Sequence, residues 1–293
     1  MTINLKLGTR ASKLALAQTD IVISALSKLG VEASAETFST KGDREQEVPL
    51  QALGDKGIFT AELEAALRGG SVQAAIHSAK DMTALDDPDL PIVAALKRDL
   101  KSDVLISEKG CLEELEEGAV IGTSSLRRSS QLREARPDLK VVPIRGNLQT
   151  RIAKWQNGVV DALILAEAGL NRMQLLSNLP THKLPWFHAP SQGIIAVQAR
   201  VTGPHWESIN HYSTFEELMI ERALVRGLGA SCRQPVACLL EKNFFQATAW
   251  GENGVRADGN IRLDDLILSE KIDAAEKLGH KLLTSLPDGL EQV

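Results

Sequence analysis

Short apolar runs alternate along the first two thirds of the chain with stretches in which apolar residues recur every three or four positions. The first pattern is typical of buried strands and the second of amphipathic helices. The patterns predict strands at 3–8, 31–39, 72–77, 141–144 and 161–166, helices at 12–29, 60–68, 126–135 and 148–157, and further apolar runs at 91–96, 103–107 and 119–122. Strands that alternate with helices predict open α/β sheets with helices on both faces.

Two segments of the chain resemble each other. Residues 5–12 and 119–126 both pass from a predicted strand through Gly-Thr into a predicted helix. The glycine is expected to allow a tight turn, and the hydroxyl residues either cap the helix or leave its N–H groups facing an anion. This similarity predicts two similarly built α/β domains whose helix N-termini face one cleft, although coincidence of common turn chemistry explains it equally well.

The pattern changes after Pro190. It predicts helices at 192–200, 214–228 and 269–283, a break at Gly203-Pro204, and antiparallel strands at 236–241, 244–250, 254–258 and 261–268 with turns at 252–254 and 258–260. Strands followed by a helix predict a separate α+β domain at the C-terminal end.

Composition narrows the class of protein. Hydrophobic residues make up 43% and charged residues 24% of the 293 residues, which is ordinary for a soluble globular protein. No apolar run approaches the roughly 18 to 20 residues that cross a bilayer, and the N-terminus shows no secretory or organelle leader. The three cysteines lack zinc-ligand spacing, so we expect free thiols, a reducing cytoplasmic location, no membrane and no metal.

Positive charge is concentrated in one stretch of an acidic chain. The formal net charge is −5, whereas Thr123 to Arg151 holds seven Lys or Arg and two acidic residues. This contrast indicates a pocket for a small polyanion, because general nucleic-acid binders are usually basic overall. A solvated Arg-rich helix face is the alternative. Arginine predominates, and its planar fork suits carboxylates and phosphates equally.

Asp81 follows the predicted strand that ends at His77, where ligand sites of α/β sheets cluster. Its carboxyl group is suited to act as general acid or base, or to hold a cationic substrate atom. Capping of a turn with Met82-Thr83 is the competing interpretation. The glycine-rich segment 53–59 is neither a P-loop nor a dinucleotide motif and is interpreted as a mobile loop over the cleft.

Cys232 lies in a predicted loop beside Arg233, where a thiol can have a depressed pKa and be nucleophilic. No His and Asn partners are placed around it as a cysteine-protease triad requires. Cys111 and Cys238 lie in or beside apolar runs, so a packing role is expected for both.

Taken together and in this order, the motifs closely resemble the hydroxymethylbilane synthase family, also called porphobilinogen deaminase, of tetrapyrrole biosynthesis. The resemblance rests on Gly8-Thr9-Arg10, Thr40-Lys41-Gly42-Asp43, Lys56-Gly57-Ile58-Phe59, His77-Ser78-Ala79-Lys80-Asp81, Gly122 to Arg128, Arg145-Gly146-Asn147 with Thr150-Arg151, Ala168-Gly169-Leu170, Gln192-Gly193 and the Cys232 loop.

The resemblance implies three domains. Residues 1–98 with 190–208 and residues 99–189 are expected to form two α/β domains like those of two-lobed periplasmic binding proteins, with a catalytic cleft between them. Residues 209–293 are expected to form an α+β domain that carries the cysteine loop. The implied enzyme is a transferase that adds four porphobilinogens, each losing ammonia, to a covalent dipyrromethane and then releases hydroxymethylbilane by hydrolysis.

The resemblance also assigns roles to residues. It implies that Asp81 is catalytic and that Cys232 holds the dipyrromethane through a thioether. Further cofactor contacts are expected from Ser78, Lys80, Thr123, Ser124, Ser125, Arg127, Arg128, Arg145 and Gly146, and substrate contacts from Arg10, Lys56, Arg151, Arg172 and Gln192. Porphobilinogen is the expected small-molecule partner, with no nucleic acid, and a monomer is expected.

Three departures from the family pattern and two rival functions remain. Met82-Thr83 replaces an apolar residue and proline, Ser231 replaces a glycine, and Gln198 replaces a glutamate.

A non-catalytic two-lobed protein that captures a small polycarboxylate would need neither Asp81 nor Cys232. A nucleic-acid module would use the 123–151 stretch, but stacking aromatics are not interleaved with it.

Overall fold

The computed structural model describes residues 4–40, 42, 58–229 and 234–290. The chain divides into two compact units, Met1–Asp99 with Gly193–Met219 (unit 1) and Leu100–Gln192 with Ile220–Val293 (unit 2). Among the described residues, no helix combines the length and the apolar character that a membrane-crossing segment needs. The division into three domains with the bounds given above stays a prediction.

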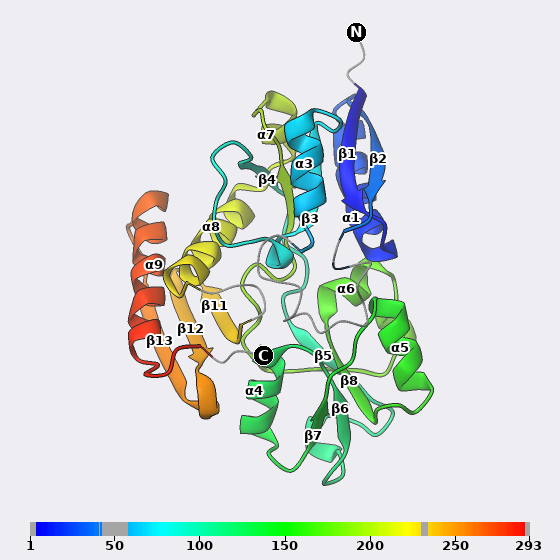
Figure 1. The fold of residues 1–293 in the computed structure, drawn as a ribbon, viewed down its shortest axis with the longest axis vertical. Helices are drawn as coiled ribbons and strands as arrows, with labels where there is room; N and C mark the ends of the chain where they lie inside the picture. Colours follow the sequence, from blue (N-terminus) through cyan, green and yellow to red (C-terminus); the bar gives the residue numbers. More distant parts are fainter. Residues whose placement is uncertain (1–3, 41, 43–57, 230–233, 291–293) are drawn as a thin grey trace. The chain divides into compact units, whose positions relative to one another are not determined.

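Unit 1 is built on a five-stranded sheet in the order β2-β1-β3-β10-β4 (Figure 1). β1, β2 and β3 are parallel, and β10 runs antiparallel to both of its neighbours. The strands are β1 (Asn4–Arg10), β2 (Glu32–Phe38), β3 (Ala74–Ser78), β4 (Ile92–Ala95) and β10 (Ile195–Gln198), and the helices are α1 (Lys13–Ser27), α3 (Ala61–Gly69) and α7 (Pro204–Ile209).

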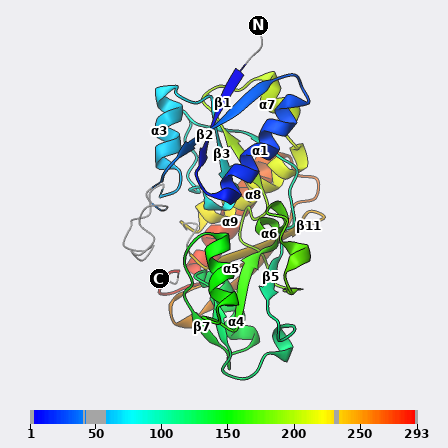
Figure 2. The same cartoon turned by 90° about the vertical axis from the view of Figure 1, so that its right-hand side faces the viewer.

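Alternating side chains of the unit 1 strands build a core on each face of this sheet. Leu7 packs with Val22 and Leu26 of α1 on one face. Ala75 packs with Leu63 and other residues of α3 on the opposite face. Figure 2 shows α1 and α3 on the two sides of β1, β2 and β3. The period-two alternation of strands and the amphipathic helices thus explain this layered arrangement.

Unit 2 contains a second sheet of the same design, in the order β7-β6-β8-β5-β9. β6, β7 and β8 are parallel, and β5 is antiparallel to both of its neighbours. The strands are β5 (Asp103–Ile106), β6 (Val120–Gly122), β7 (Lys140–Val142), β8 (Ala162–Ala166) and β9 (Thr181–Lys183), and the helices are α4 (Leu126–Ala135), α5 (Leu148–Gln156) and α6 (Glu167–Arg172). α4 packs on one face, and α5 and α6 pack on the other.

The structure confirms the prediction of two similarly built α/β domains, because β1 and β6 occupy the same position in the two sheets. The expected reason for the shared glycines is wrong. Neither Gly8 nor Gly122 has a positive φ angle. A Cβ atom at Gly8 would lie 3.2 Å from Leu63, and one at Gly122 would lie 3.2 Å from Val160, so each glycine makes room for a neighbouring side chain.

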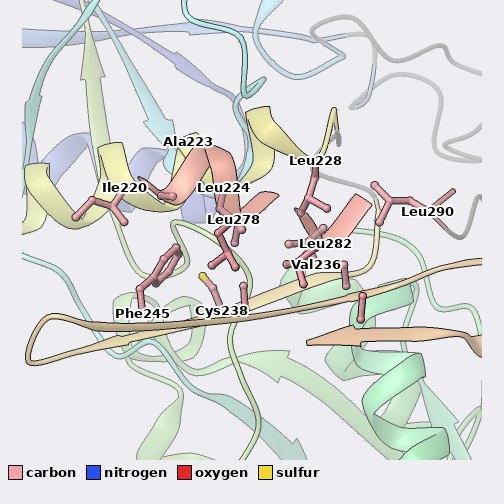
Figure 3. Close-up of a cluster of buried hydrophobic side chains, with 14 of the residues drawn as sticks. Ile220, Ala223, Leu224, Leu228, Val236, Cys238, Phe245, Leu278, Leu282 and Leu290 are labelled. Atoms are coloured by element: carbon pink, nitrogen blue, oxygen red, sulfur yellow. The ribbon is translucent and has the colours of Figure 1, made fainter. Parts of the chain in front are cut away.

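The C-terminal part of unit 2 is a three-stranded antiparallel sheet, β11-β12-β13, covered by two helices. Its elements are the second half of α8 (Tyr212–Gly227), which enters unit 2 at Ile220, β11 (Val236–Glu241), β12 (Phe244–Trp250), β13 (Arg256–Arg262) and α9 (Leu268–Thr284). Side chains such as Phe245, Leu224 and Leu278 fill the space between sheet and helices (Figure 3). The mixed α/β class with a C-terminal α+β part is thereby confirmed.

Two predicted features of the C-terminal third are wrong. Residues 192–200 do not form a helix, because the apolar run at its centre is β10, which is buried between β3 and β4. A short, continuously apolar run fits either element until its neighbours are known. The turn expected at 258–260 lies inside β13, where Gly259 pairs with Ala247 and leaves room for Leu278 of α9.

Close packing of α8 against α9 makes Gly279 intolerant of a side chain. A Cβ atom there would collide with the carbonyl oxygen of Leu224 and would lie 2.8 Å from the nitrogen of Leu228, both backbone atoms. Gly279→Ala should therefore lower the free energy of unfolding by about 1–3 kcal/mol. Urea unfolding of the variant and the wild type measures this difference.

Gly69→Ala is the matched control, because a Cβ atom added to the helical Gly69 would meet no neighbouring heavy atom within 4 Å. Replacing a glycine by alanine in a helix without a steric conflict changes stability by less than about 1 kcal/mol, in the stabilising direction. Equal stability of the two variants would contradict the packing of α8 on α9 described here.

Candidate functional site

The predicted site residues follow the carboxyl ends of parallel strands in both units. In unit 1, Arg10 ends β1, and Lys80 and Asp81 lie in a 3₁₀ turn, η2 (Ala79–Asp81), directly after β3. In unit 2, residues 123–128 follow β6, and Arg145 follows β7. Ligand sites of α/β sheets form at this edge, where strand ends and helix N-termini converge.

Asp81, Arg10 and Ser78 line one pocket of unit 1. The guanidinium of Arg10 stacks on the ring of Phe59, with 4.3 Å between its central carbon and the ring centroid. The pocket is completed by Ser12, Leu14, Ala15, Gln18, Phe59, Thr60, Ile76 and His77. The structure therefore brings together the expected catalytic carboxyl group and an expected substrate-binding cation.

Gln18 and Thr60 are pocket residues that the sequence reasoning missed. Gln18 Nε2 and Thr60 Oγ1 are buried and have no hydrogen-bond partner among the residues that the structure describes. Both side chains are nearly fully buried. A buried polar group without a partner is costly, so these atoms suit a pocket that takes up a polar ligand. In the sequence, the one available signal was a polar Gln18 on the buried face of a predicted helix.

The side chain of Gln198 orients the ring of His77. His77 Nε2 lies 3.1 Å from Gln198 Oε1, and Gln198 Nε2 donates to the carbonyl of Leu90 at 2.9 Å. Because the amide nitrogen is used by Leu90, the amide oxygen faces His77, which must carry a proton on Nε2. Gln198, one of the three departures from the family pattern, thus orients His77, which lines the pocket.

The turn after Asp81 is anchored in the core. Met82 is 7% exposed and packs with Ala79, Ile194 and Leu218, and its N–H donates to the carbonyl of Ala79 at 3.2 Å. Thr83 stands where the family pattern has proline, and a looser turn would be expected from this change. The buried side chain and the hydrogen bond of Met82 hold the turn instead.

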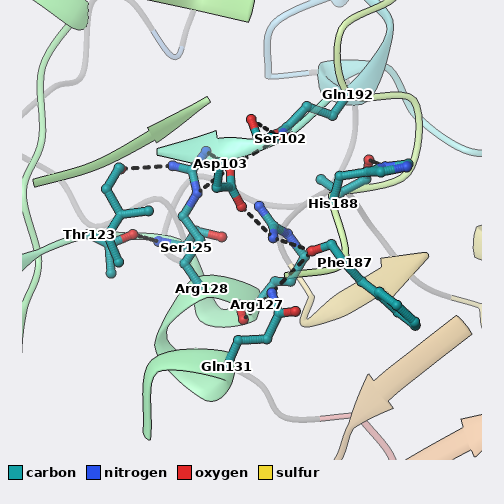
Figure 4. A network of polar contacts seen from close by, with 12 residues as sticks. Ser102, Asp103, Thr123, Ser125, Arg127, Arg128, Gln131, Phe187, His188 and Gln192 are labelled. Atoms are coloured by element: carbon teal, nitrogen blue, oxygen red, sulfur yellow. Dashed lines mark hydrogen bonds and ion pairs between the residues drawn. The ribbon is translucent and has the colours of Figure 1, made fainter. Parts of the chain in front are cut away.

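Arg127 and Arg128 are buried in unit 2 against one carboxylate, that of Asp103 (Figure 4). Arg128 Nη2 lies 2.7 Å from Asp103 Oδ1, and Arg127 Nη1 lies 2.7 Å from Oδ2. The same two guanidinium groups also reach backbone carbonyls, Arg128 Nη1 that of Ile164 at 3.1 Å and Arg127 Nη1 that of Phe187 at 3.0 Å. Asp103 was missed by the sequence reasoning, although an acidic residue opening an apolar strand was visible.

Gln192 belongs to the same network. It is 1% exposed, and its Nε2 lies 2.9 Å from the carbonyl of Lys101 and 3.1 Å from Asp103 Oδ1. Its amide therefore helps to hold the carboxylate between the two arginines. Direct contact of Gln192 with substrate stays a prediction.

Burial by itself raises the pKa of the Asp103 carboxyl group, but Arg127 and Arg128 outweigh it and hold that pKa well below its usual value. Asp103 is therefore ionised, and the three groups carry one net positive charge. This net charge is part of the positive field of the 123–151 stretch. The two guanidinium groups that produce it are almost fully enclosed.

The segment between β6 and α4 forms a compact turn. The N–H of Ser125 lies 3.2 Å from Thr123 Oγ1, and the hydroxyl of Ser124 donates to the carbonyl of Ile144 at 2.8 Å. Ser125 occupies the N-cap position of α4 without a side-chain cap hydrogen bond. The hydroxyl proton of Ser124 is therefore used within the protein, and binding of an anion by this turn stays a prediction.

The segment 145–151 is shaped by Gly146, whose φ angle of 112° and closeness to Thr150 exclude other residues. Asn147 caps α5 by accepting from the N–H of Thr150 at 2.9 Å. Arg151 Nε donates to the carbonyl of Gly146 at 2.8 Å. Arg151 and Arg145 of this segment are half-buried.

The other predicted cations differ in what is known of them. Arg172 and Lys80 are half-buried, so each keeps part of its surface toward solvent. Lys56 and Cys232 lie outside the described residues.

Removal of the Asp103 charge should destabilise the protein strongly. Asp103→Asn leaves two buried guanidinium groups without a counter-ion, a change that costs about 3–5 kcal/mol. Asp138→Asn is the control, because its ion pair with Arg136 is more exposed and water screens it, so its loss should cost much less stability. Urea unfolding at neutral pH compares the two variants, and equal losses would contradict the structural role of Asp103.

The stability that Asp103 contributes to the folded protein should depend on pH. Because the pKa of Asp103 is lowered in the folded protein, its contribution is complete above about pH 4 and is lost as the pH falls toward the folded-state value. The stability difference between wild type and Asp103→Asn should therefore shrink as the pH is lowered below about 4.

Comparison with known proteins identifies the family. A family model described as "Porphobilinogen deaminase, dipyromethane cofactor binding domain" matches residues 5–207. A probable porphobilinogen deaminase of Methanosarcina acetivorans is 39% identical over 297 residues, covering 94% of this chain and 90% of the relative. A porphobilinogen deaminase of Desulforudis audaxviator is 44% identical over 242 residues, covering 79% of this chain and 78% of the relative. The chain belongs to the porphobilinogen deaminase family.

Proposed function

We propose that this chain makes hydroxymethylbilane, with Asp81 as its catalytic carboxyl group and Cys232 as the residue that holds the dipyrromethane through a thioether. Its family makes the chain a transferase of tetrapyrrole biosynthesis, and the matched family domain is the one that binds dipyrromethane. The observation that carries the residue assignment is the unit 1 pocket, in which Asp81 and Arg10 line the same cavity.

The pocket chemistry fits porphobilinogen, which carries an acetate, a propionate and an aminomethyl group on a pyrrole ring. Arg10 can pair with a carboxylate, and stacking on Phe59 restricts the positions of its guanidinium. The protonated carboxyl group of Asp81 donates its proton to the leaving amine, which departs as ammonia. The resulting carboxylate stabilises the positive charge left on the substrate carbon and pyrrole nitrogen.

Dipyrromethane fits the donor groups present in the chain. Its two rings carry four carboxylates, which need several donors and cations. We assign this role to Ser78 at the end of β3 and Lys80 after it, and to Thr123, Ser124, Ser125, Arg127, Arg128, Arg145 and Gly146 after β6 and β7. Arg127 and Arg128 contribute mainly through their surplus charge, whereas Arg145 keeps an accessible side chain. When bound, dipyrromethane supplies the terminal pyrrole carbon to which the first substrate is joined.

The growing product gains two carboxylates with every substrate added, so its negative charge rises at each step. Arg151 and Arg172 are half-buried cations that are not assigned to the cofactor. We propose that they bind substrate or the extended product, together with Arg10 and Lys56. Hydrolysis then releases the linear tetrapyrrole. We further infer a monomer in the cytoplasm that binds no nucleic acid, which is consistent with the acidic net charge of −5.

The rival functions predict a different result for catalysis. A non-catalytic binding protein would bind a polycarboxylate without consuming porphobilinogen, and a nucleic-acid module would not turn it over. Substitution of both Arg127 and Arg128 would not separate these functions, because it leaves Asp103 as a buried charge without its partners. A substitution in the unit 1 pocket avoids this complication.

Asp81→Asn should lower kcat for porphobilinogen consumption by about 10²–10⁴-fold, because the amide cannot supply the proton for departure of ammonia. The measurement is the initial rate of porphobilinogen loss and of tetrapyrrole formation by holoenzyme. Asp89→Asn is the control, since Asp89 is an exposed carboxylate of the same segment and should retain the wild-type rate. Equal rates for wild type and Asp81→Asn would contradict the assignment, and a wild type that never consumes porphobilinogen would support the binding-protein rival.

A further inference from the structure

Three buried side chains of metal-ligand type, none of which is assigned a role above, meet in unit 2 beside Arg127. His188, Glu221 and Cys238 each direct one ligand atom into a cluster whose atoms all lie within 4.8 Å of one another. His188 is 2% exposed, and Glu221 and Cys238 are fully enclosed. The three residues come from separate segments, namely the chain before β10, helix α8 and strand β11, so no sequence spacing could reveal the cluster.

Backbone pairing fixes His188 beside Cys238. The two residues form an isolated antiparallel bridge, in which the N–H of Cys238 donates to the carbonyl of His188 at 2.9 Å. The imidazole Nδ1 lies 2.9 Å from the carbonyl oxygen of Ala189. A carbonyl oxygen can only accept, so Nδ1 carries a proton, and in the neutral ring the lone pair that a metal would bind is on Nε2.

Glu221 is oriented in a similar way. The N–H of Ser191 donates to Glu221 Oε2 at 2.5 Å, and Ser191 holds a φ angle of 63° that is uncommon for a residue with a side chain. Metal-binding histidines usually donate their second N–H to a carbonyl or carboxylate, and metal-binding carboxylates are themselves hydrogen-bonded. The contacts of His188 with Ala189 and of Glu221 with Ser191 therefore have the form of the outer contacts of a metal centre.

We propose that His188 Nε2, a carboxylate oxygen of Glu221 and Cys238 Sγ bind a Zn²⁺ ion. Cys, His and Glu are all established zinc ligands, and metal–ligand distances of about 2.0–2.3 Å place tetrahedral ligand atoms roughly 3.3–3.8 Å apart. Ligand atoms already within 4.8 Å need only small side-chain rotations to reach this spacing. A thiolate ligand favours Zn²⁺ over Mg²⁺ or Ca²⁺, which prefer all-oxygen sites.

The charges of the site balance. Binding requires the thiolate of Cys238, so the thiol proton is released to solvent, and thiolate and carboxylate together neutralise the dication. Arg127 lies within electrostatic range of Cys238, but its charge is matched by Asp103. The bound ion would join β11 and α8 to the segment that carries Gln192, which gives it a structural role. A water molecule would fill the fourth ligand position.

Cobalt substitution of the purified holoenzyme tests the site. Co²⁺ bound by a thiolate produces a charge-transfer absorption band that oxygen and nitrogen ligands do not produce. After chelator treatment, titration of the wild type with Co²⁺ should produce this band and saturate at about one ion per chain, and Zn²⁺ should displace it. Thermal unfolding should shift to higher temperature with Zn²⁺, because the ion binds the folded state.

Variants distinguish Cys238 from the other thiols. Cys111→Ser should retain the band, whereas Cys238→Ser and His188→Gln should lose it; in holoenzyme, Cys232 is proposed to be a thioether and offers no thiolate. A wild type that gives no band, or a band lost in Cys111→Ser and kept in Cys238→Ser, overturns the proposal. Because the wild-type titration needs no substitution, the test stands even if Cys238→Ser fails to fold. The result is independent of porphobilinogen turnover, which tests the proposed function separately.

Discussion

The buried carboxylate of Asp103 is the group on which the cationic part of unit 2 depends. Two arginines of α4 are almost fully enclosed, and burying such charges without compensation costs several kcal/mol for each ion. Asp103 at the start of β5 accepts from Arg128 and pairs with Arg127, and Gln192 donates to the same carboxylate. One acidic side chain thereby connects α4, β5 and the chain before β10, and it leaves a net positive charge rather than cancelling it.

This network changes the role that we infer for Arg127 and Arg128. From sequence, Arg127 and Arg128 are two cations available to a polyanion. In the structure both guanidinium groups are buried against Asp103, so they supply a fixed positive field, whereas Arg10, Arg145 and Arg151 are among the cations that keep part of their surface accessible. Buried and accessible arginines have different functions. The positive potential of the buried pair attracts an anion over a distance, whereas the accessible guanidinium groups orient its carboxylates.

The sequence predicted most elements because apolar periodicity reports burial directly. α1, α3, α4, α5, α8 and α9 and most strands lie where the patterns place them, and Ser12 caps α1 as expected, accepting from the N–H of Ala15. Prediction failed where contacts with segments distant in sequence decide between helix, strand and turn. The run around Ile195 becomes a central strand because β3 and β4 flank it, and Gly259 becomes a strand residue because Leu278 packs over it. The short elements α6, α7 and β9 carry too few residues for a clear period.

Site prediction shows the same division. Asp81 and Arg10 were identified from motifs, and the structure places both in one pocket, but Gln18 and Thr60 became visible only once the pocket existed. Asp103 and the His188, Glu221 and Cys238 cluster likewise combine residues that are distant in sequence. Long-range polar clusters depend on how the sheets fold, which local patterns do not encode.

The central claim is an enzyme whose primer is made from its own substrate and is attached at Cys232. The most direct test is the intact mass of the purified chain, followed by peptide mapping. We expect an excess mass equal to two linked pyrrole units, located on the peptide that contains Cys232 and absent from those with Cys111 and Cys238. A chain that stays unmodified and inactive after incubation with porphobilinogen would contradict it.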